Sequence, residues 1–165
     1  MSQAKRKLIS IVVPVLNEEE NVESFYMMVK DELVRLSKDY DYEFIFTDNR
    51  STDTTFERLQ ELARRDERVK IARFSRNFGY QKSIFTGYYL AAGNCAIEMD
   101  VDFQDPPHLL PQFISKWEEG YEVVYGVRNT RKEGWLMSQV RKLFYQFINL
   151  PTHIIRQFRQ RIYIT

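Results

Sequence analysis

The sequence has few of the residues that hold small stapled domains together. Its 165 residues include one cysteine, Cys95, and two histidines, His108 and His153. A disulfide framework is therefore excluded, and a structural zinc site, which needs several cysteine or histidine ligands, is not expected. Hydrophobic residues make up 44% of the chain and aromatic residues 15%, so a chain of this length can form one globular domain with an ordinary core.

Long hydrophobic runs are also missing. The longest, from Leu8 to Leu16, is interrupted by a serine and a proline and is shorter than the roughly 18 residues that a membrane span needs. The basic N-terminus and this run resemble a secretory signal, but Asn17 and three glutamates follow where a small-residue cleavage site would lie. We therefore expect the mature protein to begin at Met1 and to stay in the cytoplasm.

Acidic residues are almost absent from the end of the chain. From Arg128 onward the net charge is +7, and the preceding residues carry −6, although the whole chain is close to neutral at +1. A basic end on an acidic body predicts an anionic partner, such as an anionic membrane surface or a phosphate. A solvated basic face is the alternative. No nucleic-acid partner is predicted.

The hydrophobic pattern alternates between strands and helices. Apolar β-branched runs predict strands, and stripes at helical spacing predict the helices between them. Asn17, with Glu20 three residues later, has the spacing of a helix cap, and Asp53 or Ser51 is expected to cap the next helix. This alternation predicts an α/β fold with a mainly parallel sheet. The expected strands are 8–15, 42–47, 69–74, 95–99 and 122–127, and the expected helices include 80–92, a helix starting near Pro106-Pro107, and 135–148.

Acidic and amide residues follow several of these strands. Ligands of open α/β sheets bind at the carboxyl ends of the strands, so these side chains are expected to meet at one edge. The sequence lacks both G-x-G-x-x-G and the P-loop, so a phosphate group would have to be held here through a divalent cation. The residues are Asn17, Glu18 and Glu19 after the first strand, Asp48 after the second, and Asp100, Asp102, Gln104 and Asp105 after the fourth.

The pair Asp100 and Asp102 is the candidate metal site. In an extended chain, residues i and i+2 point the same way, so both carboxylates would face one ligand. A carboxylate directly after a buried strand is costly unless it is paired or binds a metal. A structural turn is the alternative for this Asp-x-Asp sequence.

Four segments together resemble family 2 glycosyltransferases. The run Val12-Val13-Pro14-Val15-Leu16-Asn17-Glu18-Glu19-Glu20-Asn21 is similar to the opening motif of the family. The segment Thr47-Asp48-Asn49-Arg50-Ser51-Thr52-Asp53 resembles the family's V-D-D-G-S-T-D turn. Arg76-Asn77-Phe78-Gly79 and Asp100-Val101-Asp102-Phe103-Gln104-Asp105-Pro106-Pro107 resemble the polyprenyl-phosphate branch, which includes dolichol-phosphate mannosyltransferase and bactoprenol glucosyltransferases.

The resemblance implies a GT-A fold, which is a Rossmann-like sheet flanked by helices, and inverting transfer of a sugar from a nucleotide-sugar such as UDP-glucose or GDP-mannose to a polyprenyl phosphate. Mg²⁺ or Mn²⁺ would bridge the donor diphosphate to Asp100 and Asp102. The enzyme would act peripherally at the cytoplasmic face of the membrane. Matched position by position, the donor-binding residues would be Pro14, Asn17, Glu18, Asp48, Ser51 and Asp100, and the catalytic residues would be Asp102, Gln104, Arg128 and Arg131.

The sequence departs from the family in two places. The second aspartate of the turn motif is Asn49 here, and its glycine is Arg50. The resemblance extends over residues 8–149, the expected catalytic domain, and residues 150–165 form a divergent basic tail without the family's acceptor motif. A donor-binding remnant without transfer activity is therefore an alternative function. A nucleotidyltransferase is a further alternative, disfavoured by the acidic run that begins at Glu18.

Overall fold

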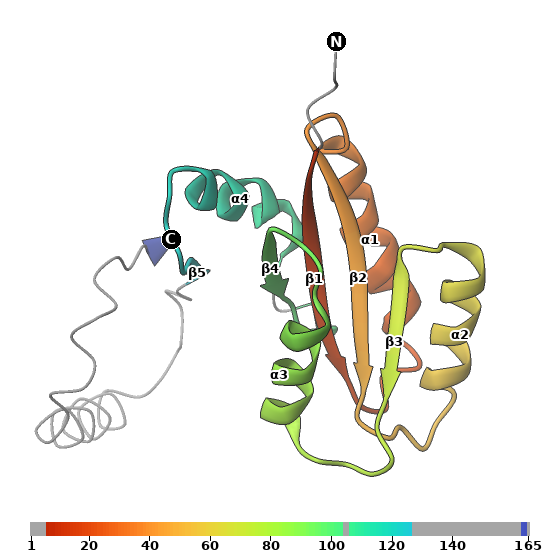
Figure 1. Cartoon of the computed structure of the whole chain (residues 1–165). Helices are drawn as coiled ribbons and strands as arrows, with labels where there is room; N and C mark the ends of the chain where they lie inside the picture. Colours follow the sequence, from red (N-terminus) through yellow and green to blue (C-terminus); the bar gives the residue numbers. More distant parts are fainter. Residues whose placement is uncertain (1–5, 104–105, 127–162, 165) are drawn as a thin grey trace, which may run out of the picture. The chain divides into compact units, whose positions relative to one another are not determined.

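The first of two compact units contains a four-stranded parallel sheet. The computed structural model describes residues 6–103, 106–126 and 163–164, and the chain divides into the units Met1–Pro111 and Gln112–Thr165. The strand order is β3-β2-β1-β4, and every pair of neighbours is parallel (Figure 1). This confirms the predicted α/β fold. The strands are β1 (Lys7–Val15), β2 (Tyr40–Asp48), β3 (Val69–Arg73) and β4 (Cys95–Glu98).

Three helices connect these strands. They are α1 (Val22–Arg35), α2 (Thr55–Arg65) and α3 (Tyr80–Leu90). The chain moves outward from β1 to β3 and then returns across the sheet to β4, so right-handed connections place α1 and α2 on one face and α3 on the other. The contacts agree, because α1 packs beside α2, whereas α3 packs against β1 and β2 (Figure 1).

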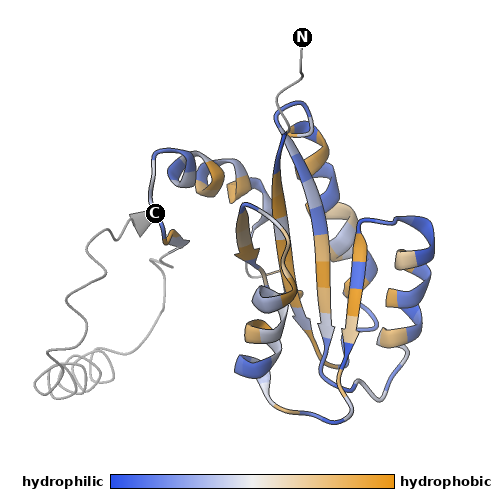
Figure 2. Cartoon of the chain, viewed as in Figure 1, coloured by the Kyte–Doolittle hydropathy of each residue, from blue (hydrophilic) through white to orange (hydrophobic). Residues whose placement is uncertain are grey.

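The core lies on the two central strands. In β1 every residue from Ile9 to Val15 is buried, as expected for a strand covered on both faces. The apolar stripe of α1, which includes Phe25, Val29 and Leu33, is buried as its spacing predicts. Figure 2 shows the apolar residues running along β1 and the middle of β2. This rigid core fixes the carboxyl ends of β1 and β4.

A buried carboxylate lies within the sheet. Glu43 in β2 is 4% exposed, and its Oε1 accepts hydrogen bonds from Ser10 Oγ (2.6 Å) and from the Ala92 amide (2.8 Å). Lys70 Nζ of β3 donates to its Oε2 at 2.5 Å. Burial raises the pKa of Glu43, but the bonds from Lys70, Ser10 and Ala92 outweigh it and hold the pKa below its usual value. The ionised form of Glu43 is therefore stabilised within the sheet by these three hydrogen-bond donors.

Helix α3 approaches the sheet with its smallest residues. Ser83 and Gly87 are its buried positions, and a Cβ placed on Gly87 would lie 2.3 Å from Val12 Cγ1. The Ser83 hydroxyl also lies 3.0 Å from the Thr47 carbonyl oxygen, to which it donates. These contacts hold α3 closely against β1 and β2.

The remaining described elements include one correction to the sequence prediction. A short 3₁₀ helix, η1 (Pro107–Leu109), leads into α4 (Leu110–Glu118), as the Pro-Pro pair predicts. The strand expected at 122–127 is wrong in extent: of its described residues, 122–126, only Tyr125–Gly126 form a strand, β5, which pairs with β6 (Tyr163–Ile164). Val123 is 51% exposed, so this part of the segment is not packed in a core as a central strand would be. The expected helix 135–148 lies outside the described residues, and no helix within them is long and apolar enough to cross a membrane.

Candidate functional site

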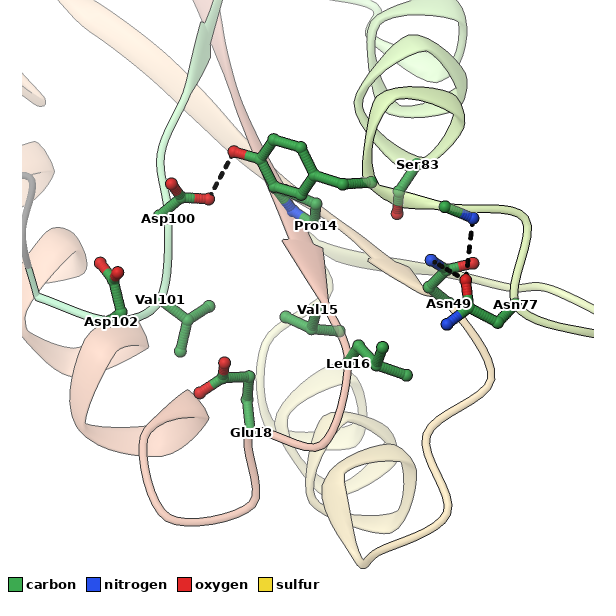
Figure 3. A pocket seen from close by; sticks show the side chains of 12 residues that line it. Pro14, Val15, Leu16, Glu18, Asn49, Asn77, Ser83, Asp100, Val101 and Asp102 are labelled. Carbon is green, nitrogen blue, oxygen red and sulfur yellow. Dashed lines mark hydrogen bonds between the residues drawn. The ribbon is translucent and has the colours of Figure 1, made fainter.

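A cavity of about 300 Å³ opens at the carboxyl ends of β1 and β4. These strands are neighbours at the point where the order of the sheet reverses, which is where open α/β sheets bind ligands. The start of α3 closes the cavity from the other side (Figure 3). The lining residues are Pro14, Val15, Leu16, Glu18, Asn49, Asn77, Gly79, Tyr80, Ser83, Asp100, Val101 and Asp102.

One side of the cavity is acidic. It is formed by Glu18 after β1 and by Asp100 and Asp102 after β4. Figure 3 shows the Asp100 and Asp102 side chains lying on the same side of the cavity, with Val101 between them. Asp100 is partly exposed and Asp102 is exposed, so both are accessible to a ligand. The structure thus brings together three of the predicted donor-side carboxylates.

Tyr80 is a lining residue that sequence analysis did not select. Its hydroxyl lies 2.7 Å from Asp100 Oδ1 and 3.0 Å from Glu98 Oε1, and it donates toward these carboxylates. Burial raises the pKa of the Tyr80 hydroxyl, and the bond to Asp100 and the charge of Glu98 raise it further. Tyr80 is therefore a neutral hydrogen-bond donor at ordinary pH. In the sequence, the one feature that could have marked Tyr80 as a site residue is its position directly after the Arg76–Gly79 motif.

The opposite side of the cavity carries two amides. Asn49 Nδ2 donates to Asn77 Oδ1 at 2.9 Å, and Asn49 Oδ1 accepts a hydrogen bond from the Phe78 amide at 2.8 Å. Asn77 Oδ1 also accepts from the Gly79 amide. A carboxylate at position 49 could not donate to Asn77 Oδ1. Asn49, where the family motif has aspartate, therefore fits the amide side chain that faces it.

Asn17 lies next to the cavity but does not line it. The expectation that Asn17 caps α1 is wrong: the helix begins at Val22 after Asn21, and its cap forms no side-chain hydrogen bond. The backbone of Asn17 is left-handed (φ 56°). Its Oδ1 accepts from the Thr52 amide at 2.8 Å, and its own amide donates to Ser51 Oγ at 2.9 Å. The side chain thus connects two loops, and this tertiary contact outweighs the local capping pattern.

Asp48 is fully buried beside the cavity. Its Oδ1 accepts from the Ser51 amide at 2.9 Å, and its Oδ2 lies 3.1 Å from Arg73 Nε, a charge contact without good hydrogen-bond alignment. Ser51 is also buried, at 3% exposure. Neither residue lines the cavity, so the geometry gives both a role in holding the turn, and their contact with a donor stays a prediction.

The cap of α2 also differs from the expectation. The N-cap is Thr54 rather than Asp53 or Ser51, although Asp53 Oδ1 accepts from the Thr55 amide at 3.0 Å.

The turn between β2 and α2 has a left-handed residue, Arg50, with φ 70°. Glycine adopts that conformation at no steric cost, and position 50 is where the family motif has glycine.

Three predicted catalytic residues lie outside the described part of the chain. They are Gln104, Arg128 and Arg131, and Asp105 and most of the basic tail lie outside it as well. Within the described residues there is no group of three or more histidine, cysteine, aspartate or glutamate side chains placed to hold a metal ion. A cation here would therefore need oxygen ligands from its substrate or from water in addition to Asp100 and Asp102.

Comparison with known proteins identifies the family. The profile described as Glycosyl transferase family 2 matches residues 10–164. The chain belongs to glycosyl transferase family 2. As a family 2 glycosyltransferase it is 43% identical over 146 residues to the uncharacterized glycosyltransferase YkcC of Bacillus subtilis, a match covering 88% of this chain and 45% of YkcC. It is 37% identical over 142 residues to the bactoprenol glucosyl transferase of Shigella phage SfV, with 86% of this chain and 45% of that protein covered.

Solved structures place the family 2 sheet within a larger GT-A fold. The mannosyltransferase PcManGT of Pyrobaculum calidifontis superposes with a TM-score of 0.62 at 20% identity, covering 76% of this chain and 36% of that one. S. aureus TarS superposes with a TM-score of 0.51 at 20% identity, covering 78% of this chain and 38% of TarS. This likeness confirms the GT-A fold that the sequence motifs predicted. The chain spans less than half the length of the curated relatives it matches.

Proposed function

We propose that the cavity binds a nucleotide-sugar whose sugar is transferred, with inversion, to a polyprenyl phosphate. The observation that carries the proposal is the acidic side of the cavity, where Glu18, Asp100 and Asp102 meet at the ends of two neighbouring strands. The similarity to bactoprenol glucosyl transferases, at 37% identity for the phage SfV protein, supports the acceptor class. UDP-glucose and GDP-mannose are the donor types we expect.

The donor set fits Mg²⁺ or Mn²⁺. Both ions prefer oxygen ligands, and Mg²⁺ in particular binds through one or two carboxylates and completes its shell with phosphate oxygens and water. Asp100 and Asp102 supply two accessible carboxylates on one side of the cavity. The mannosyltransferase PcManGT was solved with GDP-Man and Mn²⁺, which supports the same ligand class here. When bound, the cation would offset the negative charge that develops on the departing nucleoside diphosphate.

The residues of the chain would orient the donor for this reaction. Pro14 and Glu18 form the β1 side of the cavity, and Asn49 and Asn77 offer amide groups on the opposite side. A phosphate acceptor is already anionic, so it needs little help from a general base. Arg128 and Arg131 are proposed to meet phosphate groups of the donor or the acceptor, because arginine binds phosphate in a bidentate manner. Gln104 is proposed to lie near the cation and the diphosphate.

The location of the reaction follows from the acceptor. A polyprenyl phosphate is held in a bilayer, and the +7 charge of the chain from Arg128 onward suits an anionic lipid surface. We therefore propose peripheral action at the cytoplasmic face of the membrane.

Donor binding without transfer is a second candidate function. Among the described residues, all those that line the cavity fall between Pro14 and Asp102, which supports donor binding by the first unit. Positioning of an acceptor can supply about 7–11 kcal/mol of a barrier, and this chain covers 45% of the bactoprenol glucosyl transferase of phage SfV. We expect the 165-residue chain to bind its donor and to transfer sugar weakly or not at all.

The test is calorimetric titration with UDP- and GDP-sugars, with and without Mn²⁺. We expect affinity for one donor to rise with Mn²⁺ and Asp102→Asn to remove that rise, a loss at least as large as the roughly 10–100-fold that the loss of a partner of a metal ligand costs. Asp31→Asn is the matched control, because Asp31 is exposed on α1 and does not line the cavity. Unchanged Mn²⁺-dependent affinity in Asp102→Asn would refute the assignment of the metal ligand.

A further inference from the structure

Tyr80 holds a position that core packing does not explain. It is 50% exposed, so its ring contributes little to the hydrophobic core. Its polar contacts are instead with carboxylates, at 2.7 Å to Asp100 Oδ1 and 3.0 Å to Glu98 Oε1. A tyrosine hydroxyl has a single proton to donate, so the two carboxylates share one donor.

This donor lies where two negative charges come close. Glu98 ends β4 and Asp100 follows two residues later, and the Tyr80 hydroxyl is in hydrogen-bond range of both. Like charges at this separation repel each other, and a donor placed between them reduces that repulsion. The hydroxyl therefore helps to hold the Asp100 carboxylate in the rotation seen here.

The backbone fixes the donor itself. Tyr80 is the first residue of α3, and two residues of this helix anchor it to the sheet: Gly87 against Val12, and Ser83 through its bonds to Thr47. Because these close contacts leave α3 little freedom to shift, the Tyr80 hydroxyl is presented to Asp100 from a rigid element.

We propose that Tyr80 is a positioning residue that orients Asp100 as a cation ligand, with Glu98 as the second carboxylate it bridges. Partners that hydrogen-bond a ligating carboxylate fix its orientation. In known metal sites, the loss of such a partner lowers metal affinity roughly 10–100-fold. This role rests on the proposed function, which makes Asp100 a ligand of Mg²⁺ or Mn²⁺.

Binding of Mn²⁺ alone to the 165-residue chain tests the proposal, with free Mn²⁺ followed by electron paramagnetic resonance. We expect Tyr80→Phe to weaken Mn²⁺ binding about tenfold without lowering the melting temperature. Tyr89→Phe is the matched control, since Tyr89 lies on the same helix and is 82% exposed. Removing the second charge in the double variant Tyr80→Phe/Glu98→Gln should recover part of the lost affinity.

Each outcome bears on a different part of the proposal. Unchanged or tighter Mn²⁺ binding in Tyr80→Phe, or an equal loss in Tyr89→Phe, would overturn the role of Tyr80 and leave the proposed function intact, provided that Asp102→Asn still loses binding. A fall in melting temperature in Tyr80→Phe with no change in Mn²⁺ affinity would make Tyr80 structural. Absence of Mn²⁺ binding to the unsubstituted chain, with and without UDP or GDP, would overturn the metal-dependent function and the role of Tyr80 together.

Discussion

Two turns of the first unit begin in the same way and are used differently. The β2 turn (residues 48–53) and the β4 turn (residues 100–103) each start with an aspartate: Asp48 is the last residue of β2, and Asp100 follows two residues after the end of β4. In the β2 turn, Asp48 is fully buried and holds the Ser51 amide and Arg73. In the β4 turn, Asp100 is partly exposed, Asp102 is exposed, and both line the cavity. An acidic residue at a strand end is therefore not by itself a mark of a binding site, and burial separates the structural carboxylate from the accessible ones.

The largest expected effect comes from removing the buried carboxylate of the β2 turn. Asp48→Ala removes the acceptor of the Ser51 amide and leaves the partly exposed Arg73 without its charge partner, and breaking such a largely buried pair costs about 3 kcal/mol. Urea denaturation followed by circular dichroism would measure the loss. In the β4 turn, Asp102→Ala should change the free energy of unfolding by less than about 0.5 kcal/mol, because exposed positions contribute little. Equal losses in the two variants would erase the distinction between the turns.

A third carboxylate, Asp66, extends the comparison of buried with accessible carboxylates, because the free energy of unfolding should depend on pH through it. Arg68 lowers the pKa of Asp66 most strongly; burial raises it, and the bonds from Tyr26 and Lys30 lower it further, so that the net pKa lies far below the usual value. The unfolded state therefore binds the proton more readily, and the stability that Asp66 contributes is present above about pH 4 and lost as the pH falls further. We expect a loss of about 2 kcal/mol between pH 5 and pH 2.

Asp66→Asn is the variant that assigns this effect. Arg68 Nε and Nη2 donate to the two oxygens of Asp66 at 2.8 and 2.7 Å, and an asparagine keeps only one acceptor oxygen. The variant should be less stable at pH 7, and its stability should depend less on pH in the acid range. Denaturation curves at several pH values would show this, and an unchanged acid dependence would assign the effect to other carboxylates.

The smallest expected effect concerns the backbone of the β2 turn. Arg50 is exposed and has φ 70°, a conformation that costs a non-glycine residue about 1 kcal/mol. Arg50→Gly should therefore stabilise the chain by up to about 1 kcal/mol, measured by urea denaturation. Asn17→Gly is the informative partner variant, because Asn17 has a similar φ of 56° but bonds to the Thr52 amide. It should destabilise the chain, and stabilisation by both variants would show that the Asn17 bond contributes nothing.

The fold was predictable because its signals are local and strong. The long buried runs of β1 and β2 are rich in β-branched and aromatic residues, and α1 has an apolar stripe at helical spacing, so each pattern is typical of the element that forms. The short strand expected at 122–127 was not recoverable in this way, because a few apolar residues in a row do not reveal whether a strand has a buried face or which strand it pairs with.

The site was only partly predictable, for a related reason. The position of Glu18, Asp100 and Asp102 at the ends of strands places them at one edge of the sheet, and the structure brings them together. The bond from the Thr52 amide to Asn17 and the bond from Tyr80 to Asp100 join residues that are 20 or more positions apart. The burial of Asp48 depends on packing across the sheet. No single-sequence pattern encodes such contacts, although the family resemblance narrows the region in which they occur.

The buried glutamate of β2 has a consequence for how the sheet assembles. Glu43 lies directly opposite Ser10 in the parallel pairing of β1 with β2, where the two side chains are hydrogen-bonded. A slip of one residue would place Glu43 opposite Ile9 or Ile11 and turn its side chain toward the other face of the sheet. The misaligned chain would then bury an unpaired charge among aliphatic groups, at a cost of several kcal/mol. The Glu43–Ser10 pairing thus discriminates against misaligned pairings of β1 with β2, and this discrimination needs no bound ligand.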